Sequence, residues 1–98
     1  LSEFRRIAQM AQDCNVQVIP HGWNTAVGLA ADLQISAFLS NARYVEYLTP
    51  CAYIEELSAV PFQLDDEGRL TIPDTPGLGF ELNDDGLNSF CPERIEFR

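Results

Sequence analysis

Hydrophobic residues recur every three or four positions near the start of the chain, and this spacing predicts an amphipathic helix over residues 2–14. Ser2 is the expected N-cap, and Asn15 is expected to end the helix in a left-handed conformation. A second helix is predicted over residues 26–39, where polar side chains are few. We therefore expect most of this second helix to be buried.

Two short runs rich in β-branched and aromatic residues, 16–19 and 44–48, are predicted strands. Pro20 ends the first run because it lacks a backbone donor. The order helix, strand, helix, strand is typical of an α/β fold in which a helical crossover joins parallel strands. Two strands alone leave unpaired edges and an uncovered face. We therefore expect either more chain in the native protein or an assembly of several copies.

The pattern changes after about residue 55. Apolar runs at 62–64 and 70–72 flank a polar turn, which predicts a hairpin. Residues 73–79 contain two prolines and two glycines and are expected to be irregular. Asn83 is a candidate cap for a helical turn running through Leu87, and residues 91–98 carry no clear pattern.

Composition limits the classes of function. The 98 residues are 46% hydrophobic, which is enough for a packed core, and their net charge of -9 argues against nucleic-acid and anionic-membrane partners. No apolar stretch approaches the roughly 20 residues of a membrane span, and no signal-peptide pattern is present. The three cysteines form no C-x-x-C pair, so reduced thiols in the cytoplasm are expected. The first residue is Leu1 and the one methionine is Met10, which leaves open whether the chain is truncated or natural.

Two side chains lie at the C-terminal ends of the predicted strands, which is where parallel sheets usually carry their functional residues. His21 follows the first predicted strand, and Glu46 lies near the end of the second. Neighbouring strands are about 5 Å apart, so the two groups would share a pocket. An imidazole moves protons near neutral pH, and a protonated carboxyl donates to an oxyanion. Taken singly, each residue is more often structural or solvated, and Trp23 is more often a packing aromatic than a substrate contact.

The sequence resembles a known family in two places. Residues 18–25, the Ala/Leu-rich helix that follows and residues 44–47 resemble the last βα units of the enolase superfamily, in its mandelate racemase/muconate lactonizing enzyme branch. Residues 68–82, together with 85–87, resemble the C-terminal tail of that family. The resemblance implies a TIM-like (β/α)7β barrel. Residues 1–55 would supply its last βα units, and residues 56–98 would return toward a capping domain.

The resemblance also implies a function, that of an acid-sugar dehydratase or racemase. Such enzymes bind Mg²⁺ through carboxylates on the third to fifth strands and remove the proton α to a carboxylate. His21 would be the general base or acid, paired with an Asp on the sixth strand, and Glu46 would donate a hydrogen bond to the substrate carboxylate. Trp23 is a candidate for the pocket lining.

None of the metal ligands, nor the sixth-strand Asp, falls within these 98 residues, so we expect the isolated chain to be inactive. Substrate identity, and dehydration against racemisation, stay open. The alternative reading is a non-catalytic α/β module that completes its sheet by forming a homo-oligomer.

Overall fold

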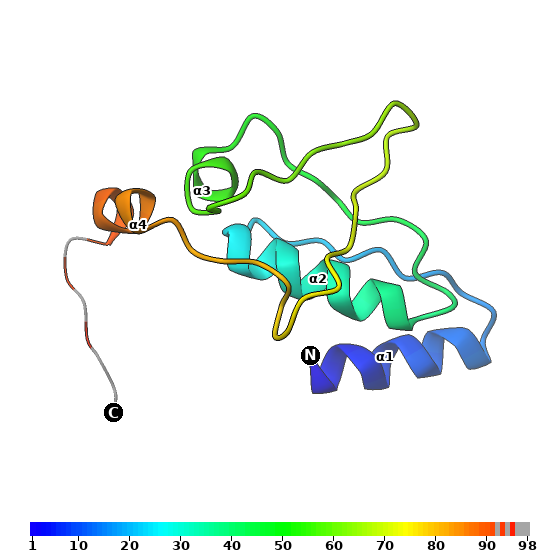
Figure 1. Cartoon of the computed structure of the whole chain (residues 1–98). Coiled ribbons are helices and arrows are strands. Elements are labelled where there is room, and N and C mark those ends of the chain that lie inside the picture. The colour runs from blue at the N-terminus through cyan, green and yellow to red at the C-terminus, as the bar shows by residue number, and fades with distance from the viewer. Residues whose placement is uncertain (92, 94, 96–98) are drawn as a thin grey trace.

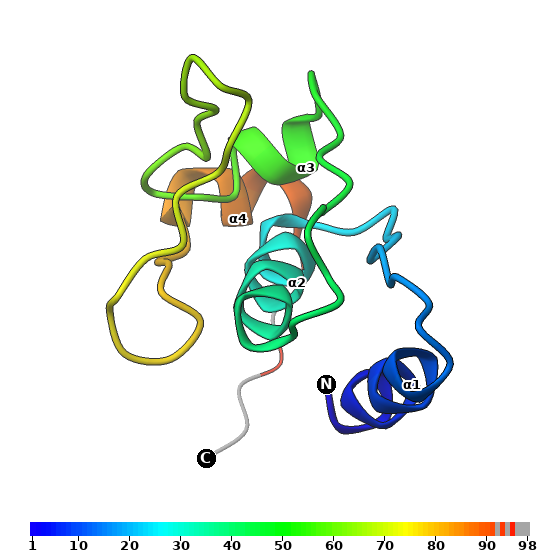
Figure 2. The same ribbon diagram turned by 90° about the vertical axis from the view of Figure 1, so that its right-hand side faces the viewer.

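The computed structural model describes residues 1–91, 93 and 95 of the chain. Within them the chain forms four helices: α1 (Ser2–Asp13), α2 (Ala26–Phe38), α3 (Ala52–Glu55) and α4 (Asp84–Phe90). The longest of these, α2, lies at the centre, with α1 along one side and α3 beside its N-terminal end (Figures 1 and 2). None of these helices is long and apolar enough to cross a membrane.

The first helix forms close to its predicted bounds. Asn15 has a φ of 58°, so the left-handed residue that ends the helix is confirmed. The prediction of Ser2 as N-cap is wrong, because Ser2 is already helical and Leu1 takes the cap position without a side-chain hydrogen bond. The Leu1 carbonyl accepts from Arg5 N at 3.0 Å and so begins the helical pattern one residue early. Only Ala8 of α1 is buried in this structure.

The core lies on the inner side of α2. Leu29 and Leu33 pack with Ile54 of α3, and six partly buried side chains surround them: Val45, Tyr47, Leu48, Cys51, Phe62 and Leu70. The expectation that α2 is mostly buried holds for this face only, since Val27 and Phe38 are exposed. The short helix α3 was not predicted. Its start is held by Glu55, whose carboxylate accepts from Thr49 Oγ1 at 3.0 Å.

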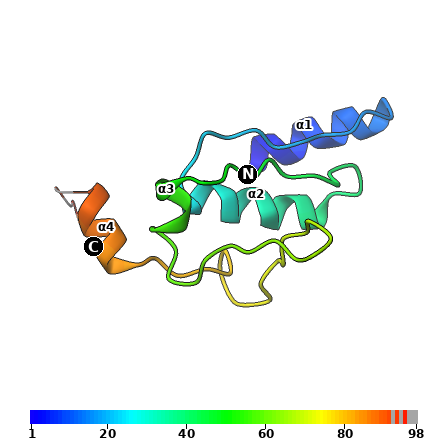
Figure 3. The same ribbon diagram turned by 90° about the horizontal axis from the view of Figure 1, so that it is seen from above.

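The two predicted strands are not confirmed as regular strands. Residues 16–19 and 44–48 are extended coil, and the structure assigns no strand to either of them (Figure 3). Two backbone hydrogen bonds connect these regions, from Val18 N to Asn41 O at 2.9 Å and from Glu46 N to Pro20 O at 3.5 Å. The second bond is long, and a lone parallel pair without flanking strands is only marginally stable. The chain therefore brings the two segments together without completing a ladder.

The return segment behaves largely as predicted. Leu64 and Leu70 form an antiparallel bridge around a turn in which the Asp65 carboxylate accepts from two backbone amides, and Gly68 has a φ of 74°. Residues 73–79 are irregular, and Gln34 of α2 holds this loop by donating to two of its carbonyls. Asn83 caps α4 by accepting from Asp85 N at 3.1 Å. Most of the tail from 91 to 98 lies outside the described residues.

Candidate functional site

The structure brings His21 and Glu46 together. His21 lies just after the first extended segment and Glu46 lies in the second, and the backbone bond from Glu46 N to Pro20 O brings these two parts of the chain side by side. The imidazole Nδ1 of His21 contacts Oε2 of Glu46. The juxtaposition expected from the strand order therefore exists even though the strands are not regular.

The chemistry of this pair follows from its donors and acceptors. An ionised carboxylate only accepts hydrogen bonds, so Nδ1 of His21 is the donor when Glu46 is charged. The neutral ring then carries its lone pair on Nε2, which can take a proton from a bound molecule. The His21 and Glu46 side chains are 69% and 51% exposed, so the pair is open to solvent. The arrangement can orient a proton-transfer group, but it does not exclude water.

The loop that carries His21 folds onto the start of α2. The Asn24 side chain lies over two glycines, and a Cβ atom at Gly28 would sit 2.3 Å from Asn24 Cβ. Trp23, in the same loop, is 80% exposed and lines none of the pockets described below. The structure therefore does not bring Trp23 into a cavity with His21 and Glu46.

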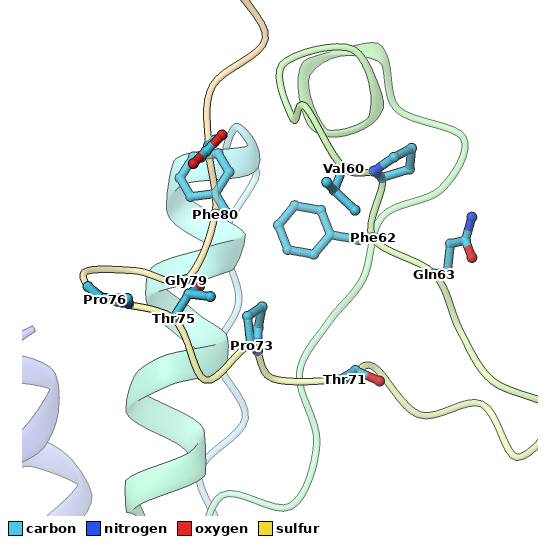
Figure 4. A pocket seen from close by; sticks show the side chains of 11 residues that line it. Val60, Phe62, Gln63, Thr71, Pro73, Thr75, Pro76, Gly79 and Phe80 are labelled. Carbon is cyan, nitrogen blue, oxygen red and sulfur yellow. The ribbon is translucent and has the colours of Figure 1, made fainter.

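Two larger pockets lie away from the pair. One, of about 870 Å³, is formed by the return segment, where the rings of Phe62 and Phe80 face the Pro73 side chain (Figure 4). The other, of about 700 Å³, lies between α2, residues 42–47 and the hairpin. Neither pocket is lined by His21, Glu46 or Trp23. A third, smaller pocket lies against α1.

The described residues do not fit a Mg²⁺ site. Among them, no group of three or more His, Cys, Asp or Glu side chains converges closely enough to hold a metal ion. The acidic hairpin turn is no exception: one oxygen of Asp65 accepts from Glu67 N and Arg69 N, and no group of three acidic ligands converges among the residues described there. Magnesium requires a near-octahedral set of oxygen ligands, which this part of the chain does not provide. The cysteines Cys14, Cys51 and Cys91 are free thiols.

Sequence reasoning treated Tyr47 only as a strand residue, but the structure gives it a polar anchor. Its hydroxyl donates to the carbonyl of Phe62 at 3.1 Å, across fifteen positions of the chain. Burial, followed by the negative charge of Glu55, raises the pKa of Tyr47 above 10.0, so the phenol stays protonated at neutral pH and keeps its donor. The sequence did contain a signal for this role. Side chains alternate along an extended segment, so Tyr47 points away from Glu46 and toward the interior.

Comparison with known proteins places this chain among characterised relatives. A sequence model described as enolase C-terminal domain-like matches residues 1–86. A D-galactarolactone cycloisomerase from Agrobacterium fabrum is 35% identical over 91% of the chain, and an arabinonate dehydratase from Saccharolobus solfataricus is 27% identical over 86% of it. The chain spans 26% and 22% of the lengths of these two relatives.

A solved structure shows the same arrangement of the backbone. The crystal structure of an enolase of the mandelate racemase subgroup from Agrobacterium tumefaciens matches 91% of the chain with a TM-score of 0.74 and 31% sequence identity. The match covers 24% of that structure's chain. The 98 residues therefore correspond in backbone to about a quarter of a larger enzyme-like fold.

Proposed function

The chain belongs to the enolase C-terminal domain-like family, and from this premise we propose that it forms the C-terminal part of a sugar-acid dehydratase, racemase or cycloisomerase. Residues 1–55 would contribute the last βα units of the barrel, and residues 56–98 the return toward a capping domain. The observation that carries the proposal is the contact between His21 and Glu46 on adjacent extended segments. The activities named for two relatives, a D-galactarolactone cycloisomerase and an arabinonate dehydratase, support a sugar acid or its lactone as the substrate.

In this proposal His21 moves the proton. Nε2 takes the proton from the carbon α to the substrate carboxylate, and the bonding electrons move onto the carboxylate oxygens. Oε2 of Glu46 would accept the bond from Nδ1 and orient the ring for this transfer. The other oxygen, Oε1, would carry a proton and donate a hydrogen bond to the developing oxyanion. A bound Mg²⁺ would supply charge neutralisation at that oxyanion, and its ligands would come from segments other than the described residues of this chain.

One test joins this chain to the rest of a working barrel. The 98 residues replace the matched segment of the Agrobacterium fabrum cycloisomerase, and turnover of D-galactarolactone is measured. His21→Asn should lower the rate about 10²–10⁴-fold, the usual effect of losing a general base. Asp66→Asn is the matched control, because it neutralises an exposed carboxylate on the hairpin turn.

The chimera test has clear outcomes. Circular dichroism first checks that each variant folds as the parent chimera does. A folded His21→Asn chimera that keeps the parental rate would refute the proton-transfer role. The isolated chain should exchange no α-proton of arabinonate for deuterium, even with Mg²⁺ added, and measurable exchange would contradict the idea that further segments are needed.

A second candidate function is a non-catalytic module that assembles with copies of itself. The observation that favours it is the apolar surface left exposed on the first 19 residues, which includes Leu1, Ile7, Met10, Val16 and Ile19. Such a surface suits either the remainder of a barrel or a homo-oligomer. Sedimentation of the isolated chain separates the two, since a cooperatively unfolding monomer would exclude assembly as a requirement for folding.

A further inference from the structure

The contact between His21 and Glu46 is held by few bonds of its own. The backbone bond that joins the two segments beside it, from Glu46 N to Pro20 O, is 3.5 Å long. Both side chains are more than half exposed, so packing does not restrict them strongly. Another contact must therefore fix the orientation of the segment that carries Glu46.

Tyr47 supplies that contact from the opposite side of the segment. Successive side chains of an extended chain point in opposite directions, so Glu46 faces His21 while Tyr47 faces the interior. The Tyr47 ring packs against the core cluster of Leu29, Leu33 and Ile54, and its hydroxyl donates to Phe62 O at 3.1 Å. The packed ring sets how close the segment lies to the core. The hydrogen bond limits rotation of the segment about its own long axis.

We propose that Tyr47 is a positioning residue whose hydrogen bond to the return segment directs the Glu46 carboxylate toward His21. The inference rests on the proposed function, since it assigns Tyr47 a part in arranging the proton-transfer pair. It also gives the return segment a role in the site, because the acceptor of the bond belongs to Phe62. The raised pKa of Tyr47 keeps this donor available over the neutral range.

The test uses the whole chain and needs neither substrate nor metal. His21 is the one histidine of the sequence, so its ring ¹⁵N signals are identified without assignment. At a pH where the ring is neutral, these signals report which nitrogen carries the proton. Glu46→Gln defines the spectrum of a ring without its carboxylate partner. Tyr47→Phe keeps the ring in the core and removes only the hydroxyl.

We expect Tyr47→Phe to shift the ring ¹⁵N signals most of the way toward their Glu46→Gln values. Tyr44→Phe is the matched control, because Tyr44 lies in the same segment, is 64% exposed and makes no hydrogen bond through its hydroxyl among the described residues. This control should leave the spectrum as in the parent chain. Tyr47→4-aminophenylalanine restores an N–H donor at the same position and should return the signals toward parental values.

Three results would overturn the positioning role. A folded Tyr47→Phe chain with the parental imidazole spectrum would show that the hydroxyl does not act on the pair. An equal shift in Tyr44→Phe would remove its specificity. Loss of helical circular dichroism in Tyr47→Phe would show that Tyr47 supports the fold in general. The readout does not involve turnover, so an inactive chimera would refute the proposed function while leaving this inference in place.

Discussion

At Gly86, helix propensity and packing predict opposite effects of an alanine substitution on the stability of the chain. It lies in α4 and is buried, and a Cβ atom added there would sit 2.0 Å from the backbone oxygen of Glu56 and 2.8 Å from its carbonyl carbon. The obstruction is backbone, so it cannot rotate away as a flexible side chain would. Gly86→Ala therefore forces α4 away from the chain that follows α3.

The magnitude follows from two competing terms. Replacing glycine by alanine inside a helix gains about 1 kcal/mol from backbone entropy alone. Overpacking against a rigid group costs about 1–3 kcal/mol, and a contact this short belongs near the upper end of that range. Moving α4 also separates the rings of Tyr53 and Phe90, whose centroids are 5.0 Å apart. We expect Gly86→Ala to destabilise the chain by about 1–2 kcal/mol, which lowers Tm by roughly 4–16 °C for a domain of this size.

Thermal and urea unfolding followed by circular dichroism measure this effect. Asn88→Ala is the matched control, because Asn88 is an exposed residue of the same helix and its replacement should gain a few tenths of a kcal/mol, up to about 0.7. If Gly86→Ala raised the stability as Asn88→Ala does, the close packing of α4 on Glu56 would be refuted.

Three further predictions concern the same fold. Leu33→Ala should destabilise the chain by about 2–5 kcal/mol in urea unfolding, because Leu33 is 4% exposed in the core; a loss below about 1 kcal/mol would argue against that core. Burial raises the pKa of Asp32 above its usual 3.8, so its ionisation opposes folding and stability falls as pH rises through that pKa. Asp32→Asn should therefore stabilise the chain at pH 7 and add little at pH 3, and equal gains at both would contradict this origin. Asn83→Ala removes the cap of α4 and should cost about 0.5–2 kcal/mol, read from unfolding together with faster amide exchange at Asp85; unchanged exchange there would exclude the cap.

Sequence reasoning succeeded where local physics decides the conformation. The 3.6-residue period gave α1 and α2, because a helix closes its hydrogen bonds within itself. Asn15 and Asn83 were identified because a left-handed end and an N-cap depend on the chemistry of single residues. The hairpin around Gly68 was identified for the same reason.

Strand prediction failed because a strand is stabilised by its neighbours. Residues 16–19 have the composition of a buried strand, but Val16 and Ile19 are 52% and 55% exposed. The backbone bond from Val18 N goes to Asn41 O, which lies before the second segment, and the second segment donates back through Glu46 N to Pro20 O. A β-branched run indicates what a chain can form beside other strands, and within the described residues those strands are missing on either side. The helix α3 was missed for a related reason, because its four residues are too few to show a period.

The contact between His21 and Glu46 depends on side-chain hydrogen bonds that tie each of the two extended segments to another part of the chain. We call these bonds clamps. Asn41 donates from Nδ2 to the carbonyls of Ala8 and Val16, at 3.0 and 3.1 Å, and so ties the first segment to α1. Tyr47 ties the second segment to the return segment. Each clamp is a side-chain donor on a backbone acceptor, which does not require a continuous ladder. Because each of these hydrogen bonds holds one of the two segments, His21 and Glu46 can stay in contact without regular strands.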